Sequence, residues 1–421
     1  MADTNEKTAP IERTLAGGPN RRQVLTRAAV LGGVAGLAGR AGRALAQDAT
    51  PAAAAAPSGD PVRIGQPYNL TGGYASLDTP ARDGSALAAK EINARGGVLG
   101  RPLELIVYDG RSDVPTIASI TQRLVEEDQV VALAGLTDTS YMRAAGPVAQ
   151  ENQIPFLDVG GTAPIITQIG DYIFMLPFGD NVQAAAAAEY VAEQGWTTAA
   201  MLVDEGMDYT KFLARYFEQA FTGAGGEIVS RLAYNIGDTD FSAQITEFKN
   251  LDPQPDFYFI SANPGEIGTI VQQARAAGLT APIVGGDGYD TPLLAQLGSQ
   301  AGPVNDVIFT THQGIYDDSP AAQAFIAAYE AEYGRPPENV FAALGYDGIN
   351  LMVDAMERAG TTDGPAVRDA LAATQGFAGV TGTISYEEGS RIPSKSVALI
   401  EVVDNENTLI NVVVPENVPP A

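Results

Sequence analysis

The residues of this sequence that could bind a small charged molecule lie in four short loops. Each loop follows a run of apolar residues, and the four span 68–77, 135–140, 158–162 and 285–290. The second and third loops present small and hydroxylated residues in front of helical segments, so their backbone N–H groups and the helix dipole could receive an anion such as a carboxylate. The fourth loop holds an acid, Asp287, among glycines, and it could receive a cation.

Each of these positions also has a structural alternative. Thr139, Ser140 and Thr162 stand where hydroxyl side chains commonly cap a helix. Asp287 could close an Asx-turn within its own loop. Thr162 follows Gly161 in a double-glycine turn, where the backbone can approach a ligand closely, and this favours the binding interpretation there.

The composition excludes several kinds of chemistry. Cysteine is absent and His312 is the single histidine, which excludes Cys/His zinc sites, thiol nucleophiles, disulfide scaffolds and multi-histidine metal sites. No GxGxxG motif follows the first strand and no GxxxxGK[ST] motif occurs, which argues against a nucleotide site. We therefore expect no metal, no cofactor and no enzymatic activity. The formal net charge of −26 would repel nucleic acid or an anionic membrane.

The elements that must position these loops form an α/β pattern from residue 62 onward. Short apolar runs ending in Gly or Asp alternate with segments of helical period, which is typical of parallel sheets covered by helices. With 421 residues and 45% hydrophobic composition, the chain can form two doubly wound Rossmann-like lobes, in which ligands bind beyond the carboxyl ends of the strands. The expected strands are 62–65, 103–108, 130–134, 154–157, 199–203, 257–261, 283–285 and 307–310, and the expected helices include 81–94, 210–222 and 267–277.

The first 46 residues are typical of an export signal rather than of a folded element. Arg21 and Arg22 precede a short apolar run, and Ala44 and Ala46 fit the small-x-small rule for signal cleavage. The segment resembles a twin-arginine signal. An amphipathic surface helix is the alternative, and the glycines of the apolar run disfavour it. Residues 47–61 are expected to form a flexible linker, and because no cysteine follows the run, we expect a soluble periplasmic protein without a lipid anchor.

Four motifs make the sequence recognisable. They are GGYASLDTPARDGSALAAKEINARGGVLGRPLELIVYD, IPFLDVGGTAP, QQARAAGL and PIVGGDGYDTPLL, in that order. The sequence resembles the Leu/Ile/Val-binding family of periplasmic solute-binding proteins over residues 62–415, and the INxxGG segment is its most specific part. The resemblance implies a type I binding protein with two lobes joined by three hinge crossings. Lobe 1 would comprise 62–180 and 311–383, and lobe 2 would comprise 181–310 and 384–415.

The resemblance also implies how a ligand is held. In amino-acid binders of this family, a hydroxyl residue and a backbone N–H hold the ligand carboxylate, and these positions match Thr139, with Ser140 beside it, and Thr162. The ammonium group would be held by the Gly161 carbonyl, the Thr162 hydroxyl and Asp287 of the other lobe. The family more often has Glu at this last position, so Asp287 has a shorter reach.

A tyrosine after the strand 199–203 commonly lines the pocket in this family. Tyr209 is the match, and Asp208 could take its place, since the loop is one residue longer; packing is the structural alternative for Tyr209. Five further residues are candidates for the pocket: Tyr74, Leu77, Asn263, Tyr289 and His312, although a lone histidine is usually structural.

These observations predict an extracytoplasmic receptor, active as a monomer, for a small amino acid. By resemblance, it would close its lobes around a branched-chain or other aliphatic amino acid and deliver it to the permease subunits of an ABC importer. Two alternatives stay open: the same fold binding an aromatic acid, an amide or urea, and a ligand-sensing subunit for a membrane receptor.

Overall fold

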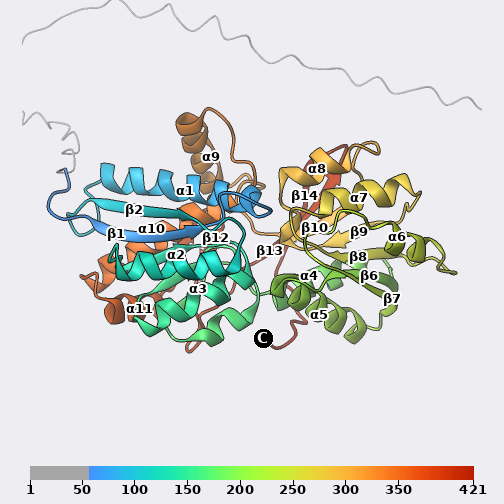
Figure 1. Ribbon diagram of the computed structural model, residues 1–421, viewed down its shortest axis with the longest axis horizontal. Helices are drawn as coiled ribbons and strands as arrows, with labels where there is room; N and C mark the ends of the chain where they lie inside the picture. Colours follow the sequence, from blue (N-terminus) through green and yellow to red (C-terminus); the bar gives the residue numbers. More distant parts are fainter. Residues whose placement is uncertain (1–55) are drawn as a thin grey trace, which may run out of the picture. The chain divides into compact units, whose positions relative to one another are not determined.

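Two β-sheets with helices on both faces make up the part of the chain that the structure, a computed structural model, describes, residues 56–421 (Figure 1). The predicted signal residues Arg21, Arg22, Ala44 and Ala46, and most of the predicted linker, lie outside the described residues. Within 56–421, no helix combines the length and the apolar character that a membrane crossing requires.

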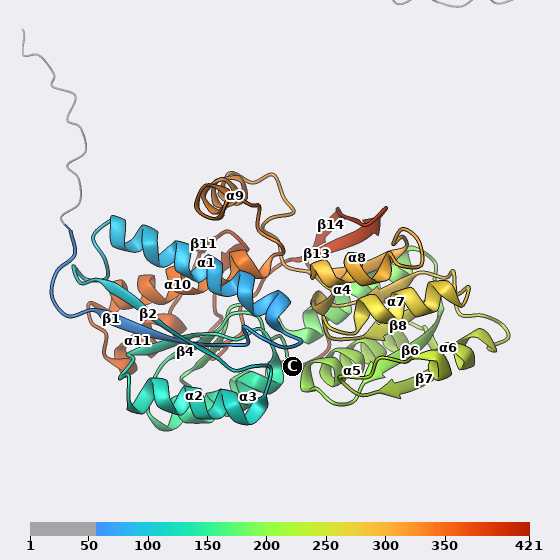
Figure 2. The same cartoon turned by 45° about the horizontal axis from the view of Figure 1, so that its top comes forward.

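The first sheet has five parallel strands in the order β2-β1-β3-β4-β5. Helices α1 and α10 pack against each other, as do α2 and α3, and the two pairs cover the sheet (Figure 2). The elements are β1 (Val62–Tyr68), α1 (Ala75–Ala94), β2 (Leu103–Asp109), α2 (Val114–Glu126), β3 (Ala132–Gly135), α3 (Thr139–Glu151), β4 (Phe156–Asp158), the 3-10 turn η1 (Pro164–Ile169), β5 (Ile173–Met175), α9 (Pro320–Tyr333), α10 (Phe341–Ala359), α11 (Gly364–Ala372) and the hairpin β11 (Phe377–Gly379) and β12 (Gly382–Ile384).

The second sheet has the order β14-β13-β10-β9-β8-β6-β7, and its two last strands in sequence, β13 and β14, run antiparallel to their neighbours. Helix α4 packs against α5, and α7 packs against α8. The elements are α4 (Asp180–Glu193), β6 (Thr198–Asp204), α5 (Asp208–Gly223), β7 (Glu227–Tyr234), α6 (Ser242–Lys249), β8 (Phe257–Ser261), α7 (Ile267–Ala276), β9 (Ile283–Gly285), η2 (Asp287–Tyr289), α8 (Pro292–Gly298), β10 (Val307–Thr311), β13 (Val397–Val403) and β14 (Glu406–Val413).

The sequence pattern explains why the central strands form. Every residue of β8, β9 and β10 is buried, as expected for parallel strands with helices on both faces. The edge strand β7 instead alternates exposed and partly buried residues. Periodicity therefore predicts β8 and β9 with their observed bounds, whereas the short predicted strand at 62–65 continues to Tyr68 in the structure.

Helix α1 begins earlier than the predicted start at residue 81, although Pro80 lies inside it. Proline has no backbone N–H, so the carbonyl of Ser76, four residues earlier, loses its helical partner. The side chain of Asn339 replaces that donor, with Nδ2 2.9 Å from the Ser76 oxygen. The first turn of α1, which leads into the loop at 68–77, is thus stabilised by a residue distant in sequence.

Helices α1 and α10 approach each other backbone to backbone. A methyl group at Gly84 would lie 1.8 Å from the carbonyl oxygen of Ala342, and one at Gly345 would lie 1.9 Å from that of Ala81. Glycine at both positions permits this contact. The close packing fixes the amino-terminal end of α1, which points toward the second lobe (Figure 2).

The chain passes between the two lobes three times: between β5 and α4, after β10, and before β13. This arrangement confirms the predicted fold class of two doubly wound lobes with three crossings. One expected boundary differs. Ile384 and Tyr386, assigned to lobe 2 by the sequence, pack in the core of lobe 1, where the Tyr386 hydroxyl donates to the Met175 carbonyl at 2.8 Å. The Tyr386 ring packs against Phe174, and Ile392 also packs against the core of lobe 1, so the third crossing follows Ile392.

Candidate functional site

A small cavity lies where loops after the strands of both sheets meet. Its volume is about 10 Å³, close to the space that one water molecule needs. An amino acid could enter only if the two lobes separated. The residues that line it are Tyr74, Leu77, Thr137, Gly160 and Phe341 from lobe 1 and Tyr209, Pro264, Asp287 and Gly288 from lobe 2.

The hydroxyl residues on the lobe 1 side do not cap their helices. Asp138 is the cap of α3, and its Oδ1 accepts from the backbone N–H groups of Ser140 at 2.7 Å and Tyr141 at 3.4 Å. Thr139 Oγ1 instead accepts from the backbone N–H of Ala163 at 3.3 Å. Thr162 Oγ1 is buried without a hydrogen-bond partner. Thr139 and Thr162 are therefore adjacent, and the Thr162 side chain faces the carboxyl group of Asp180.

The N–H groups of the double-glycine turn have a partner within the protein. Asp158 Oδ1, at the end of β4, accepts from Gly161 N at 2.9 Å and from Gly160 N at 3.4 Å. Burial raises the pKa of Asp158 well above its ordinary value. This role of Asp158 was not predicted from the sequence, although an acid at the end of a strand and two residues before a glycine pair is a visible signal.

The lobe 2 side presents Asp287. The residue is 2% exposed, and its Oδ1 accepts from Gln183 Nε2 at 2.9 Å. Its backbone N–H donates to Gln183 Oε1 at 3.2 Å. The carboxylate thus bonds to α4 rather than closing an Asx-turn in its own loop. His312 Nε2 lies 3.8 Å from Asp287 Oδ2, but burial lowers the pKa of His312 to about 4, so the ring is neutral near pH 7.

Polar contacts join the two lobes around the cavity. The Tyr74 hydroxyl lies within hydrogen-bond distance of both Asp138 Oδ2 in lobe 1 and Asn263 Oδ1 in lobe 2. Asn263 Nδ2 donates to Asp204 Oδ2 at 2.7 Å. Asn263 was a candidate from the sequence, and in the structure it acts as a bridge from β6 to Tyr74. Burial raises the pKa of Asp138 to about 6.

The structure distinguishes Tyr209 from Asp208. Tyr209 lines the cavity, and its hydroxyl accepts from the backbone N–H of Gly288 at 2.9 Å. Asp208 forms ion pairs with Arg143 and Lys211 outside the cavity. The backbone N–H of Asp208 donates to Ser140 Oγ at 2.9 Å, so the Ser140 hydroxyl faces the second lobe rather than the cavity.

The remaining candidates divide into lining and packing residues. Leu77 lines the cavity together with Tyr74. Tyr289 instead donates from its hydroxyl to the Ile260 carbonyl and packs in the core of lobe 2. The His312 ring stacks on Phe178, with ring centroids 3.9 Å apart, behind Asp287.

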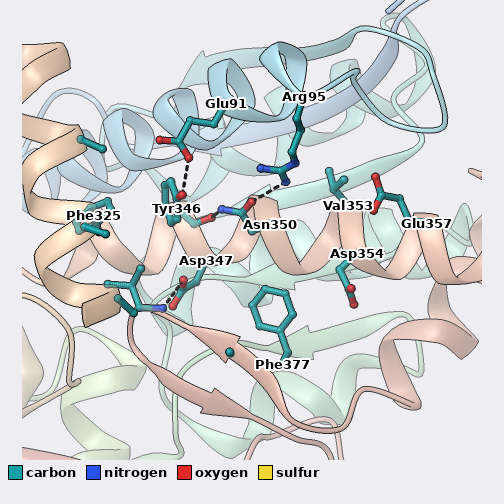
Figure 3. Close-up of a pocket in the computed structure, with 15 residues that line it drawn as sticks. Glu91, Arg95, Phe325, Tyr346, Asp347, Asn350, Val353, Asp354, Glu357 and Phe377 are labelled. Carbon is teal, nitrogen blue, oxygen red and sulfur yellow. Dashed lines mark hydrogen bonds between the residues drawn. The ribbon is translucent and has the colours of Figure 1, made fainter. Parts of the chain in front are cut away.

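A larger groove of about 550 Å³ lies on lobe 1, among α1, α9, α10 and β11 (Figure 3). Three of its acidic and basic side chains are paired within lobe 1. Glu91 accepts from the Tyr346 hydroxyl, Arg95 donates to Asn350 at 3.1 Å, and Asp347 accepts from the turn between β11 and β12 at 2.8 Å. All the residues that line the groove belong to lobe 1, whereas the smaller cavity is lined by residues of both lobes.

Known proteins of one family are similar to this chain. The family model described as periplasmic binding protein matches residues 61–407. The leucine-, isoleucine-, valine-, threonine-, and alanine-binding protein of Pseudomonas aeruginosa is 26% identical over 78% of this chain and 86% of its own length. The Leu/Ile/Val-binding protein of Escherichia coli is 25% identical over 76% of this chain and 84% of its own.

Solved structures of solute-binding proteins are also similar to this chain. A leucine binding protein from Thermotoga maritima aligns with a TM-score of 0.79 and 31% identity, covering 84% of this chain and 99% of its own. A branched-chain amino acid transporter substrate binding protein from Streptococcus pneumoniae, solved with isoleucine, aligns with a TM-score of 0.78 and 30% identity over 83% and 99%. A solute binding protein from R. palustris, solved with benzoate, shares the fold with a TM-score of 0.75. It is 23% identical and covers 86% of this chain and 98% of its own.

Proposed function

Since the chain belongs to the periplasmic binding protein family and is related there to Leu/Ile/Val-binding proteins, we propose that it captures a small amino acid between its lobes. It would deliver a branched-chain or other aliphatic amino acid to the permease subunits of an ABC importer. Its working form would be a monomer.

The observation that carries this proposal is the pair of opposed poles at the cavity. Asp287 of lobe 2 lines the cavity and offers a buried carboxyl group for an ammonium group. Thr139 and Thr162 of lobe 1 are not among the lining residues, but they lie in the loops on the opposite side and offer hydroxyl groups for a carboxylate once the lobes separate. Only a state with the lobes together satisfies both ends of a zwitterion, so the ligand would stabilise closure. Leu77 and Phe341 supply apolar walls beside the poles.

An aromatic acid is the second candidate, because a relative in fold holds benzoate. Such a ligand has no cation, so the buried Asp287 would remain without a cationic partner. Leaving a buried charge uncompensated costs several kcal/mol, which favours the zwitterion. Amides and urea also lack the ammonium group. A ligand-sensing subunit for a membrane receptor would use the same site, and only its partner would differ.

We also propose that the protein is exported to the periplasm without a lipid anchor. The support for this is the sequence pattern of Arg21 and Arg22 followed by Ala44 and Ala46, together with the family. Residues 1–46 would be removed during export.

Calorimetric titration of the protein with L-leucine, L-isoleucine, L-valine, L-threonine, L-alanine and benzoate tests the proposed ligand class. We expect at least one amino acid to bind and to raise the melting temperature, since ligand at 100 times its Kd adds about 2.7 kcal/mol of stability. Asp287→Asn should weaken that binding at least about thirtyfold, because breaking a buried charge-assisted contact costs about 2 to 5 kcal/mol.

The Asn side chain still accepts from Gln183, so the melting temperature of the unliganded variant should change little. A structural role for Asp287 would give the reverse, a lower melting temperature with nearly normal affinity. The aromatic-acid candidate predicts a different result. Neither protein would then bind an amino acid, and Asp287→Asn would bind benzoate as well as the native protein or better.

A further inference from the structure

A segment that follows β14, residues 414–421, lies beside the hinge between the lobes. It forms neither helix nor strand, but Pro415 and Pro419 are buried. Its three prolines restrict φ, which reduces the conformational entropy that the segment loses when it takes one path over the surface. A small number of hydrogen bonds can therefore hold this segment in place.

The 414–421 segment lies close to all three crossings. Val414 borders a hollow of about 260 Å³ together with Gln313 of the second crossing and Ser394 of the third. Further along, the Pro419 carbonyl accepts from Asn181 Nδ2 at 2.9 Å. Asn181 is the second residue of α4 and follows the first crossing. The segment thus runs across the hinge from the second and third crossings to the first.

The far end of the segment lies where the two lobes meet. Pro420 and Ala421 border a hollow of about 270 Å³, which is also lined by Ile165 and Gln168 of η1 in lobe 1 and by residues of α5 in lobe 2, among them Tyr216. Figures 1 and 2 both mark the C-terminus at the boundary between the lobes. Because η1 and α5 belong to different lobes, opening of the lobes would separate the two sides of this hollow.

Glu189 of α4 is the main anchor of the segment. Its Oε1 accepts from the backbone N–H groups of Glu416 at 2.8 Å and Asn417 at 2.9 Å, and from Asn417 Nδ2 at 3.4 Å. Apolar packing contributes less, since Val414 is 72% exposed and Val418 is 38% exposed. The segment also borders an open groove of about 470 Å³ between α4 and α5. Loss of the Glu189 carboxylate should therefore detach the segment without unfolding α4.

We propose that the 414–421 segment is a strap that holds the two lobes in the closed arrangement, and that Glu189 positions it. The cavity between the lobes has room for about one water molecule, so the contacts around the strap belong to a closed arrangement. Contacts that exist only when the lobes are together stabilise closure. The kinetic test of the strap rests on the proposed function, whereas its structural test needs no ligand.

Glu189→Ala is the decisive variant, and stopped-flow release of the tightest amino acid of the panel is the measurement. We expect release to be about threefold to tenfold faster, the effect of losing about one net hydrogen bond from the closed state. The association rate should change little. Glu189→Gln keeps the accepting Oε1 and should restore release to nearly the native rate. Glu193→Ala, on the next turn of α4 and exposed, removes the same charge away from the strap and should release ligand at the native rate.

Solution scattering without ligand tests the strap independently. The open arrangement should be more populated in Glu189→Ala, so its radius of gyration should exceed that of the native protein, while the melting temperature changes little. If the segment only covers α4, the melting temperature will fall and both the radius and the release rate will stay native, which would overturn the proposal. If no amino acid of the panel binds, the proposed function fails, and equal radii would then decide against the strap as well.

Two further variants keep the test decisive. Asn417→Pro removes two of the three donors to Glu189 without altering α4, and it replaces Glu189→Ala if that variant fails to fold, with the same expected results. Ile165→Ala changes the lobe 1 surface beside the end of the strap. If both sites act through the strap, Ile165→Ala combined with Glu189→Ala should release ligand no faster than the faster single variant. A combined effect equal to the product of the two would contradict the proposal.

Discussion

Buried carboxylates without cationic partners surround the cavity between the lobes. They are Asp78, Asp138, Asp158, Asp180 and Asp287. Among the described residues, the neutral His312 is the only basic side chain that pairs with any of them. Burial raises the pKa of the first four. A ligand with an ammonium group relieves this concentration of acids, whereas a purely anionic ligand adds to it.

Asp78 allows the pH dependence of this feature to be tested. Burial raises its pKa from 3.8 to about 7, although the Thr137 hydroxyl and the Asn69 N–H donate to it. The folded protein therefore holds this proton more tightly than the unfolded chain, and stability falls as pH rises from about 4 to about 7. Asp78→Asn should become steadily more stable relative to the native protein over this range. Thermal unfolding at pH 4, 5, 6 and 7 measures the difference.

Asp113→Asn serves as the control of opposite sign. Asp113 caps α2, and the Thr116 hydroxyl and N–H lower its pKa. The ionised Asp113 stabilises the folded protein above the pKa that this group has in the unfolded chain, and this stabilisation is lost at lower pH. The free energy of unfolding of Asp113→Asn should therefore fall relative to that of the native protein as pH rises. A pH-independent difference between Asp78→Asn and the native protein would show that folding does not raise the pKa of Asp78.

At the scale of elements, α3 of lobe 1 meets the start of α5 in lobe 2. Ser140 and Arg143 lie nearly one turn apart on α3, and both contact Asp208. Lys211, one turn into α5, also pairs with Asp208, with Nζ 2.9 Å from Oδ1. Asp208 thus has one cationic partner across the interface and one on its own helix.

Arg143→Gln should therefore weaken ligand affinity modestly, by up to about fivefold, because a partly exposed ion pair contributes about 0.2 to 1 kcal/mol. The effect should appear mainly as faster ligand release and should vanish at high salt, where the pair is screened. Stopped-flow dissociation at low and high ionic strength measures both.

Lys211→Gln removes an ion pair with the same carboxylate inside one lobe, so its ligand release should match that of the native protein. Equal effects of Arg143→Gln and Lys211→Gln would show that Asp208 acts within lobe 2 and not in closure.

At the scale of the whole molecule, charge is distributed unevenly along the chain. The first 46 residues hold seven basic and three acidic side chains, whereas the full chain is strongly acidic. This reversal, with the paired Arg21 and Arg22, supports the proposed export signal.

Replacing both Arg21 and Arg22 with lysine preserves the charge and removes the guanidinium pair. If an export receptor reads that pair, unprocessed precursor should accumulate in the cytoplasm, as measured by cell fractionation and immunoblotting. Arg40→Lys with Arg43→Lys is the matched control and should leave export unchanged. Mature protein in normal amount in the periplasm of the first variant would contradict the proposal.

Much of the fold could be predicted because its signals are local. β8 and β9 were predicted with their observed bounds, since each is an apolar run bounded by turn residues. Helix α1 was predicted too short because Pro80 indicated a helix start, and the donor that compensates for it, Asn339, lies far away in the sequence. The third crossing was placed too early because the packing of Tyr386 against Phe174 has no local signal.

The sequence by itself determined the fold class, the family and the loops that form the cavity, because hydrophobic period, glycine turns and family motifs are properties of short segments. Only the tertiary structure decided what each polar group does there. It placed Asp180 beside Asp287 through Gln183, and it directed Ser140 toward Asp208 instead of the cavity. These contacts join segments far apart in the chain, and they depend on how the two lobes meet.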